Sequence, residues 1–313
     1  MEPPNDSILK VLQEVEKKRG TRVFGLLQGS GHHICGQLFG AVLKARDCFN
    51  GIDTLDVVIH SPGGHPLIAY QLMKFFRRKC KHVNVIVPLQ AKSAATLMCF
   101  GADRIFMGEF SELGPLDVQI NDPVERGSEP FSPLDEFKSM EFLREYAVEL
   151  LDYFTLLFIK RSGISIKEAI HESIPCVTGM MRPLYEKIDP LEVGGHRRAL
   201  AIGEEYASRL LRLVGNQHGN SIVEKLVWKY PSHDFVVDID EARELNLPVS
   251  ALPPDQDNLL TDAIMEIEED EVCFYGFAHT KPQTPDGATK PPKAVNGARK
   301  LRKANGAPAE LHQ

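Results

Sequence analysis

Apolar and polar positions alternate in blocks along the first third of the chain, and the blocks predict helices and strands in turn. Apolar residues at helical spacing predict a helix over residues 7–19. Short, nearly continuous apolar runs predict buried strands at residues 22–27, 54–60, 82–87 and 104–107. Helical patterns fit between them, over residues 35–49, 66–78 and from about residue 93. This order favours right-handed crossovers and a mostly parallel sheet, with ligand sites at the carboxyl ends of the strands.

The second half of the chain is mainly helical in pattern. Helices are expected over residues 134–160, 165–172, 195–214, 221–229 and 240–245, with a brief strand at 235–237. Residues 255–271 are acidic and predict a peripheral helix. From residue 281 the chain is rich in Pro, Gly, Lys and Ala, with seven basic residues against two acidic ones, which is typical of a disordered tail. The expected parts are a helical extension (1–20), an α/β domain (21–254, with a helical insertion at about 133–230), an acidic peripheral segment (255–280) and a disordered basic tail (281–313).

Composition narrows the class of protein. Of the 313 residues, 43% are hydrophobic, which is enough for a sizeable core, and the net charge of -7 argues against a nucleic-acid binder. Six scattered cysteines without a C-x-x-C pair indicate thiols in a reducing cytosol. No apolar run approaches the roughly 20 residues that span a bilayer. We therefore expect a cytoplasmic protein with no membrane span, no metal site and no cofactor.

The segment VVIHSPGGHP (57–66) carries the first candidate chemistry. A buried strand runs into Gly63 and Gly64, and glycine allows the positive φ that turns backbone N–H groups toward a ligand. Two such groups can form an oxyanion hole. Taken alone, two glycines after a strand more often form a plain turn.

The segment PLQAKSAATLMCFGADRIFMG (88–108) carries the second set of candidate catalytic residues. Ser93 opens a helix of small residues, and a helix N-terminus favours an oxyanion or alkoxide. Serine is also a preferred N-cap, so Ser93 alone fits a structural role as well.

The order of the motifs is more specific than any one of them. HSPGG, AKSAATL, GADRIFMG, SELGPLDVQI, YPSHDF and EARELNLP follow one another over about residues 23–249. In this the chain resembles the Clp/crotonase superfamily, and most closely its signal-peptide-peptidase-like branch, the serine dehydrogenase proteinases. The resemblance implies an α/β spiral of ββα-type units with a mostly parallel sheet and added helices, a catalytic domain over 21–254 and a homo-oligomer. It also implies a serine hydrolase with Ser93 as nucleophile and the amides of Gly63, Gly64 and Ala94 in the oxyanion hole.

The sequence offers several candidates for the general base that would activate Ser93. Clp-type peptidases carry a histidine in the region that here reads SELGPLDVQI, where Asp117 stands instead. We rank His233 of YPSHDF first, because its side-chain pKa is near neutral, then Lys138 and then Asp117. His60 is interpreted as a strand-end residue and His65 as a possible substrate contact. Lys92 is unsuitable if it points away from Ser93.

Three functions fit these features. The leading one is an ATP-independent serine peptidase acting on peptide or protein substrates. A crotonase-type acyl-CoA enzyme would use the paired amides but leave Ser93 without a role. A non-catalytic interaction protein would explain the missing histidine and the basic tail.

Overall fold

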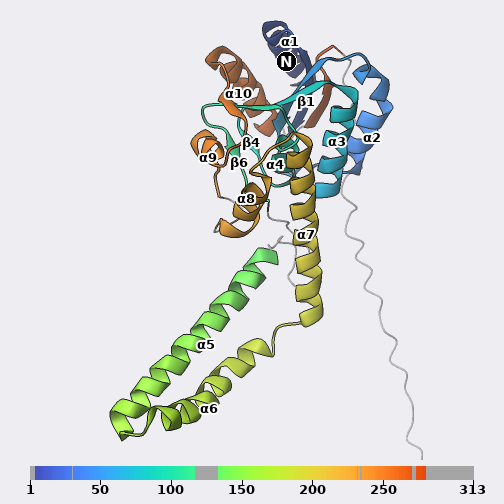
Figure 1. Cartoon of the computed structure of the whole chain (residues 1–313). Coiled ribbons are helices and arrows are strands. Elements are labelled where there is room, and N and C mark those ends of the chain that lie inside the picture. Colours follow the sequence, from blue (N-terminus) through green and yellow to red (C-terminus); the bar gives the residue numbers. More distant parts are fainter. Residues whose placement is uncertain are drawn as a thin grey trace, which may run out of the picture. The chain divides into compact units, whose positions relative to one another are not determined.

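A computed structural model describes residues 4–29, 31–116, 133–230, 232, 235–269 and 273–279 (Figure 1). The first part of the chain contains α1 (Pro4–Arg19), β1 (Arg22–Gln28), α2 (Gly36–Lys44), a 3-10 turn (Arg46–Phe49), β2 (Thr54–His60), α3 (Pro66–Lys79), β3 (His82–Val87), β4 (Gln90–Ala91), α4 (Ala94–Cys99), β5 (Arg104–Met107) and β6 (Glu112–Leu113). The second part contains α5 (Pro133–Ser162), α6 (Ile166–Tyr185), α7 (Pro190–Leu213), α8 (Gly219–Glu224), a π-helical turn (Lys225–Lys229), α9 (Ile239–Glu244), β7 (Val249–Ala251), α10 (Pro254–Glu269) and β8 (Cys273–Phe277).

The main sheet has six strands in the order β7-β5-β3-β2-β1-β8. All neighbours are parallel except β1 and β8. The four strands expected from apolar runs are present, and the first of them extends one residue further than expected, to Gln28. A mostly parallel α/β fold with added helices is therefore confirmed.

Helices cover both faces of this sheet, as the alternation of side chains along β2 requires. Val57 and Ile59 belong to the larger core cluster, which α2, α3 and α4 cover, whereas Val58 belongs to a second cluster under α1 and α10 (Figure 1). Each fully buried aliphatic side chain of this kind stabilises the fold by about 1.5–3 kcal/mol. α1 and α10 are thus packed on the sheet itself.

A buried carboxylate ties α1 to the sheet. Asp56 of β2 has no exposed surface, and its Oδ2 accepts hydrogen bonds from Arg19 and from Thr21. Asn84 of β3 donates to Oδ1 at 2.7 Å. The charge of Asp56 is therefore fully paired inside the protein, as a buried carboxylate requires.

The sequence pattern did not indicate β7 and β8. β8 pairs antiparallel with β1 and buries Phe274 and Phe277, one in each core cluster. It lies in residues 255–280, which we expected at the periphery. The strand is five residues long with no alternation of apolar and polar residues, so only its pairing with β1 reveals it.

α5 and α6 lie side by side (Figure 1). The sequence predicted that α6 ends near residue 172, but the helix continues through Pro175 and Pro183 to Tyr185. The helix packs along α5, where Thr155 donates a hydrogen bond to Ser173 at 3.3 Å, and this tertiary packing favours a helix that the two prolines alone disfavour. Of the helices in the described residues, none is long and apolar enough to cross a membrane. The division of the chain into domains stays a prediction.

A small second sheet follows the main one and positions the candidate site. β4 pairs parallel with β6. Isolated bridges extend this pair on both sides, from Ser61 to Ala91 and from Leu113 to Val237. Segments around residues 61, 91, 113 and 237 are thereby brought together.

Candidate active site

Ser93 lies on a strained turn between β4 and α4. Its backbone has φ 48° and ψ -115°, one of two positive φ values among the described non-glycine residues. Such a conformation costs about 1–3 kcal/mol and is found preferentially at functional sites. Within the described part of the chain, the Ser93 side chain makes no capping hydrogen bond to α4. The N-cap interpretation of Ser93 therefore lacks the bond that defines it.

The two glycines of the HSPGG motif lie directly against this turn. Gly63 has φ 116° and Gly64 has φ 137°. A β-carbon on Gly63 would stand 2.9 Å from both the Cβ of Ser93 and the carbonyl oxygen of Lys92. One on Gly64 would stand 2.4 Å from the carbonyl oxygen of Ile34. Both positions therefore require glycine, for conformation and for space.

The backbone N–H groups of Gly63 and Gly64 differ in their hydrogen bonding. The N–H of Gly63 is buried and donates to Oγ of Ser61 at 3.1 Å. Ile34 bonds to the residues on either side of Gly64, through Ile34 N–H to Gly63 O at 2.7 Å and His65 N–H to Ile34 O at 2.9 Å. Gly64 is exposed, and among the described residues no hydrogen-bond acceptor faces its N–H or that of Ala94. The amide of Gly63 is thus committed to Ser61, whereas those of Gly64 and Ala94 make no hydrogen bond among the described residues.

Lys92 is directed toward the small sheet. Its Nζ lies 2.9 Å from Glu112 and 3.5 Å from the carbonyl oxygen of Phe235. The lysine next to Ser93 is therefore held by other groups, as expected if it points away from Ser93.

Of the three candidate bases, the structure describes only Lys138. His233 and Asp117 lie outside the described residues. Lys138 of α5 is half-buried, and its Nζ donates to the carbonyl oxygen of Tyr230 at 2.6 Å. This contact brings the start of α5 to the beginning of the YPSHDF segment.

His60 and His65, which flank the loop, have different surroundings. His60 is 2% exposed, and its Nε2 lies 2.6 Å from Glu268 of α10, while no hydrogen-bond partner in the described residues faces its Nδ1. Burial lowers the pKa of His60, and the Glu268 carboxylate offsets this only in part. His60 is a buried strand-end residue, whereas His65 is exposed beside Gly64 at the start of α3.

One group of side chains in the described residues has the spacing of metal ligands, although the sequence had suggested none. Ligand atoms of Glu136, Glu192 and His196 lie within 4.8 Å of one another. Nδ1 of His196 is 2.5 Å from Glu136. Nε2 of His196 lies 3.9 Å from Glu192, so the ring stands between two carboxylates.

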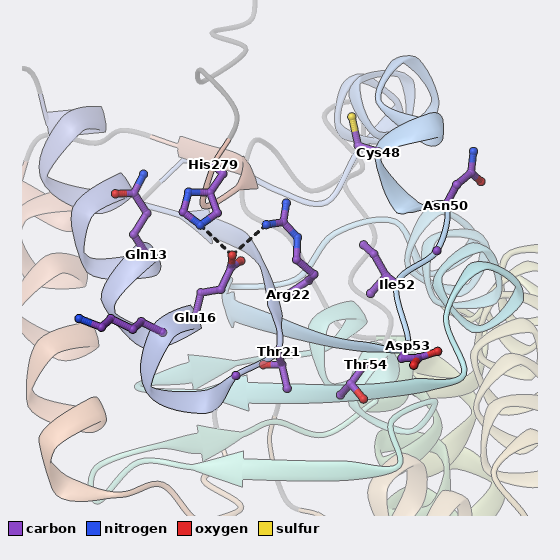
Figure 2. A pocket seen from close by; sticks show the side chains of 13 residues that line it. Gln13, Glu16, Thr21, Arg22, Cys48, Asn50, Ile52, Asp53, Thr54 and His279 are labelled. Carbon is purple, nitrogen blue, oxygen red and sulfur yellow. Dashed lines mark hydrogen bonds and ion pairs between the residues drawn. The ribbon is translucent and has the colours of Figure 1, made fainter.

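A groove of about 940 Å³ opens at the amino-terminal ends of the strands, opposite the end where Ser93 lies (Figure 2). It is lined by Arg22 and Thr54, the first residues of β1 and β2, whereas Ser93 follows the carboxyl ends of the strands. Figure 2 shows Glu16 held between Arg22 and His279, each at 2.9 Å. This groove is separate from the site around Ser93.

Comparison with known families agrees with the motifs. Residues 39–126 match the family of ClpP-like SDH-type serine proteinases. The match contains Gly63, Gly64, Ser93 and Ala94. It confirms the resemblance to serine dehydrogenase proteinases and the Clp-like fold class.

Longer matches are to proteins without an assigned activity. One uncharacterised protein of Methanocaldococcus jannaschii is 25% identical over 304 residues, which cover 93% of this chain and 86% of that protein. A second from the same organism is 28% identical over 259 residues, with 79% and 72% covered.

Two solved structures superpose on parts of the chain. A mutant of the 1510-N membrane-bound stomatin-specific protease gives a TM-score of 0.27 at 14% identity, over 44% of this chain and 63% of that one. A mutant of ClpP1 from Listeria monocytogenes gives 0.25 at 18% identity, over 51% and 83%. Scores this low carry no argument about the present site.

Proposed function

We propose that this chain is an ATP-independent serine peptidase that cleaves peptide or protein substrates through an acyl-enzyme on Ser93. The observation that carries the proposal is the strained backbone of Ser93 against the glycine loop. A serine on a sharp turn between a strand and a helix exposes its hydroxyl to substrate. The similarity to a family of serine proteinases supports the same reaction class.

In this mechanism, Ser93 Oγ attacks the carbonyl carbon of the scissile bond while a base takes the hydroxyl proton. The carbonyl oxygen becomes an oxyanion, which the N–H groups of Gly64 and Ala94 stabilise. The base passes the proton to the leaving amine as the C–N bond breaks, and water then hydrolyses the ester. Gly63 shapes the loop, since its own N–H is bonded to Ser61.

We propose His233 as the base, with Lys138 second and Asp117 third. Support comes from the described residues on either side of His233. The ring centroids of Tyr230 and Phe235 are 4.5 Å apart. The carbonyl oxygen of Phe235 lies 3.5 Å from Nζ of Lys92, the residue before Ser93. Because His233 precedes Phe235 by only two residues in the sequence, this contact supports His233 as the first candidate.

The test is intact-mass labelling with a fluorophosphonate, comparing the wild type with Ser93→Ala. Labelling of the wild type alone, together with hydrolysis of a peptide library by the wild type alone, supports the proposal. A folded wild type that is not labelled contradicts it and favours a crotonase-type acyl-CoA enzyme or an interaction protein. Acyl-CoA turnover separates these two.

We also propose a homo-oligomer in the cytoplasm. Phe142, Tyr153 and Leu156 of α5 are 60–67% exposed, which is unusual for large apolar side chains on one helix. Six cysteines without a disulfide fit a reducing compartment. Light scattering measures the oligomeric mass, and Leu156→Glu should lower it if α5 lies at the subunit interface. An unchanged oligomeric mass would show that Leu156 of α5 does not lie at the subunit interface.

A further inference from the structure

Ser61 occupies the point where the glycine loop meets the strand before Ser93. Its N–H donates to Gln90 and its carbonyl oxygen accepts from Lys92, both at 3.0 Å, so its backbone pairs with β4. Its side chain is fully buried, and Oγ accepts the N–H of Gly63 at 3.1 Å. One residue therefore holds both the strand that leads to Ser93 and the loop that faces it.

Gln28, the last residue of β1, orients this hydroxyl. It is 2% exposed, and its Oε1 accepts the hydroxyl proton of Ser61 at 2.7 Å. The competing acceptor, the carbonyl oxygen of Gly63, lies at 3.5 Å, too far for a strong hydrogen bond. A serine hydroxyl has a single proton, so donation to Gln28 leaves its lone pairs for the N–H of Gly63.

We propose that Gln28 and Ser61 are positioning residues for the oxyanion hole. Gln28 sets the direction of the Ser61 hydroxyl, and that hydroxyl turns the N–H of Gly63 inward. The amide left for the oxyanion is then that of the next residue, Gly64, which is exposed and makes no hydrogen bond among the described residues. The inference rests on the proposed function, and it adds two residues that act through Gly63 and do not touch substrate.

Loss of this link should affect the transition state more than substrate binding. Ser61→Ala leaves the buried N–H of Gly63 without its acceptor, and the loop then adopts other peptide orientations. Removal of an oxyanion donor costs about 10²–10³ in kcat, so a misdirected donor should cost about 10–100-fold. KM should change little, because the hole stabilises charge that develops in the transition state.

The experiment measures the second-order rate of fluorophosphonate labelling, and kcat and KM for a peptide, in Gln28→Met, Ser61→Ala and the double variant. Gln28→Met keeps the side-chain length and removes the acceptor. Val58→Ala is the control for general destabilisation, because Val58 is fully buried on β2, the strand that precedes Ser61, but faces α1 and α10. Hydrogen exchange of the Gly63 amide reports on the loop independently of activity.

Slower labelling in both single variants, with a double variant no slower than Ser61→Ala, supports the proposal, because Gln28 acts only through Ser61. Rates equal to wild type, additive losses, or an equal loss in Val58→Ala would overturn it. A wild type that is not labelled contradicts the proposed function and with it the catalytic role. Faster exchange at Gly63 in Ser61→Ala would then still support the structural link, and unchanged exchange would overturn that too.

Discussion

Gly63 is packed so closely on Ser93 that a β-carbon on the glycine would lie 2.9 Å from the β-carbon of the serine. The two residues come from separate turns, one after β2 and one after β4, and both have positive φ. The close approach sets the glycine loop directly against the turn that holds Ser93. Four features of this site and one of the fold lead to measurable expectations.

The backbone strain at Ser93 should lower the free energy of unfolding, and variants of this residue can measure it. Glycine adopts φ 48° and ψ -115° without the β-carbon conflict that alanine and serine suffer. We expect Ser93→Gly to be more stable than Ser93→Ala by about 1 kcal/mol in urea unfolding, with both variants inactive. Equal stability would mean that the turn stores no strain.

Gly63→Ala should abolish activity and destabilise the fold, because the added carbon meets the backbone of Lys92 and has no room to move. Gly51→Ala is the matched control, since Gly51 also has positive φ (78°) but nothing within 4 Å of its added carbon. The control should lose only the conformational cost of about 1–2 kcal/mol and keep full activity. Thermal melts and the labelling rate measure both, and equal losses in the two variants would rule out the steric argument.

The base can be identified from single variants and pH profiles. If His233 is the base, His233→Ala lowers kcat by about 10²–10⁴ and removes the rise of kcat/KM around pH 6.5. Lys138→Met should then affect stability through the lost bond to Tyr230, with a small effect on kcat. The opposite pattern would assign the base to Lys138, and an effect of neither would assign it to Asp117.

His60 should make the fold less stable in acid. Burial lowers its pKa in the folded protein, so the neutral form is favoured there. Below about pH 6.5 the unfolded chain binds a proton at this residue that the folded protein does not, and stability falls by at most about 1.4 kcal/mol per pH unit. Urea unfolding at pH 7.5 and 5.5 should show the wild type losing stability relative to His60→Gln, whose amide can still donate to Glu268. A margin that is the same at both pH values would show that His60 titrates as it does in the unfolded chain.

The buried carboxylate of Asp56 should matter far more than an exposed one. Asp56→Ala leaves the Arg19 guanidinium, whose side chain is 11% exposed, without its partner and should destabilise the protein by about 3–5 kcal/mol. Asp53→Ala removes a carboxylate whose pair with Lys81 is 75% exposed on both sides, and its unfolding curve should match the wild type. Similar unfolding midpoints for the two variants would contradict the role of Asp56 in holding α1.

Much of the fold and the centre of the site could be predicted from local patterns. The runs that became β2 and β3 are short and apolar, and a buried parallel strand needs little else. Ser93 and the glycine pair Gly63 and Gly64 could also be identified from the sequence, because a small-residue helix and a Gly-Gly turn each involve only consecutive residues. β8 was not, because its pairing with β1 is a relation between distant segments.

The sequence by itself determined the parallel α/β sheet, the serine at the start of a small-residue helix and the glycine loop. Only the tertiary structure decided that Gly63 packs on Ser93 and donates its N–H to Ser61, that Lys92 contacts Glu112, and that Ser61 donates to Gln28. Hydrophobic periodicity and glycine conformation act between near neighbours in the chain. Gln28 and Ser61 are 33 residues apart and His60 and Glu268 are 208 apart, so these contacts depend on strand register and helix packing, which no local spacing encodes.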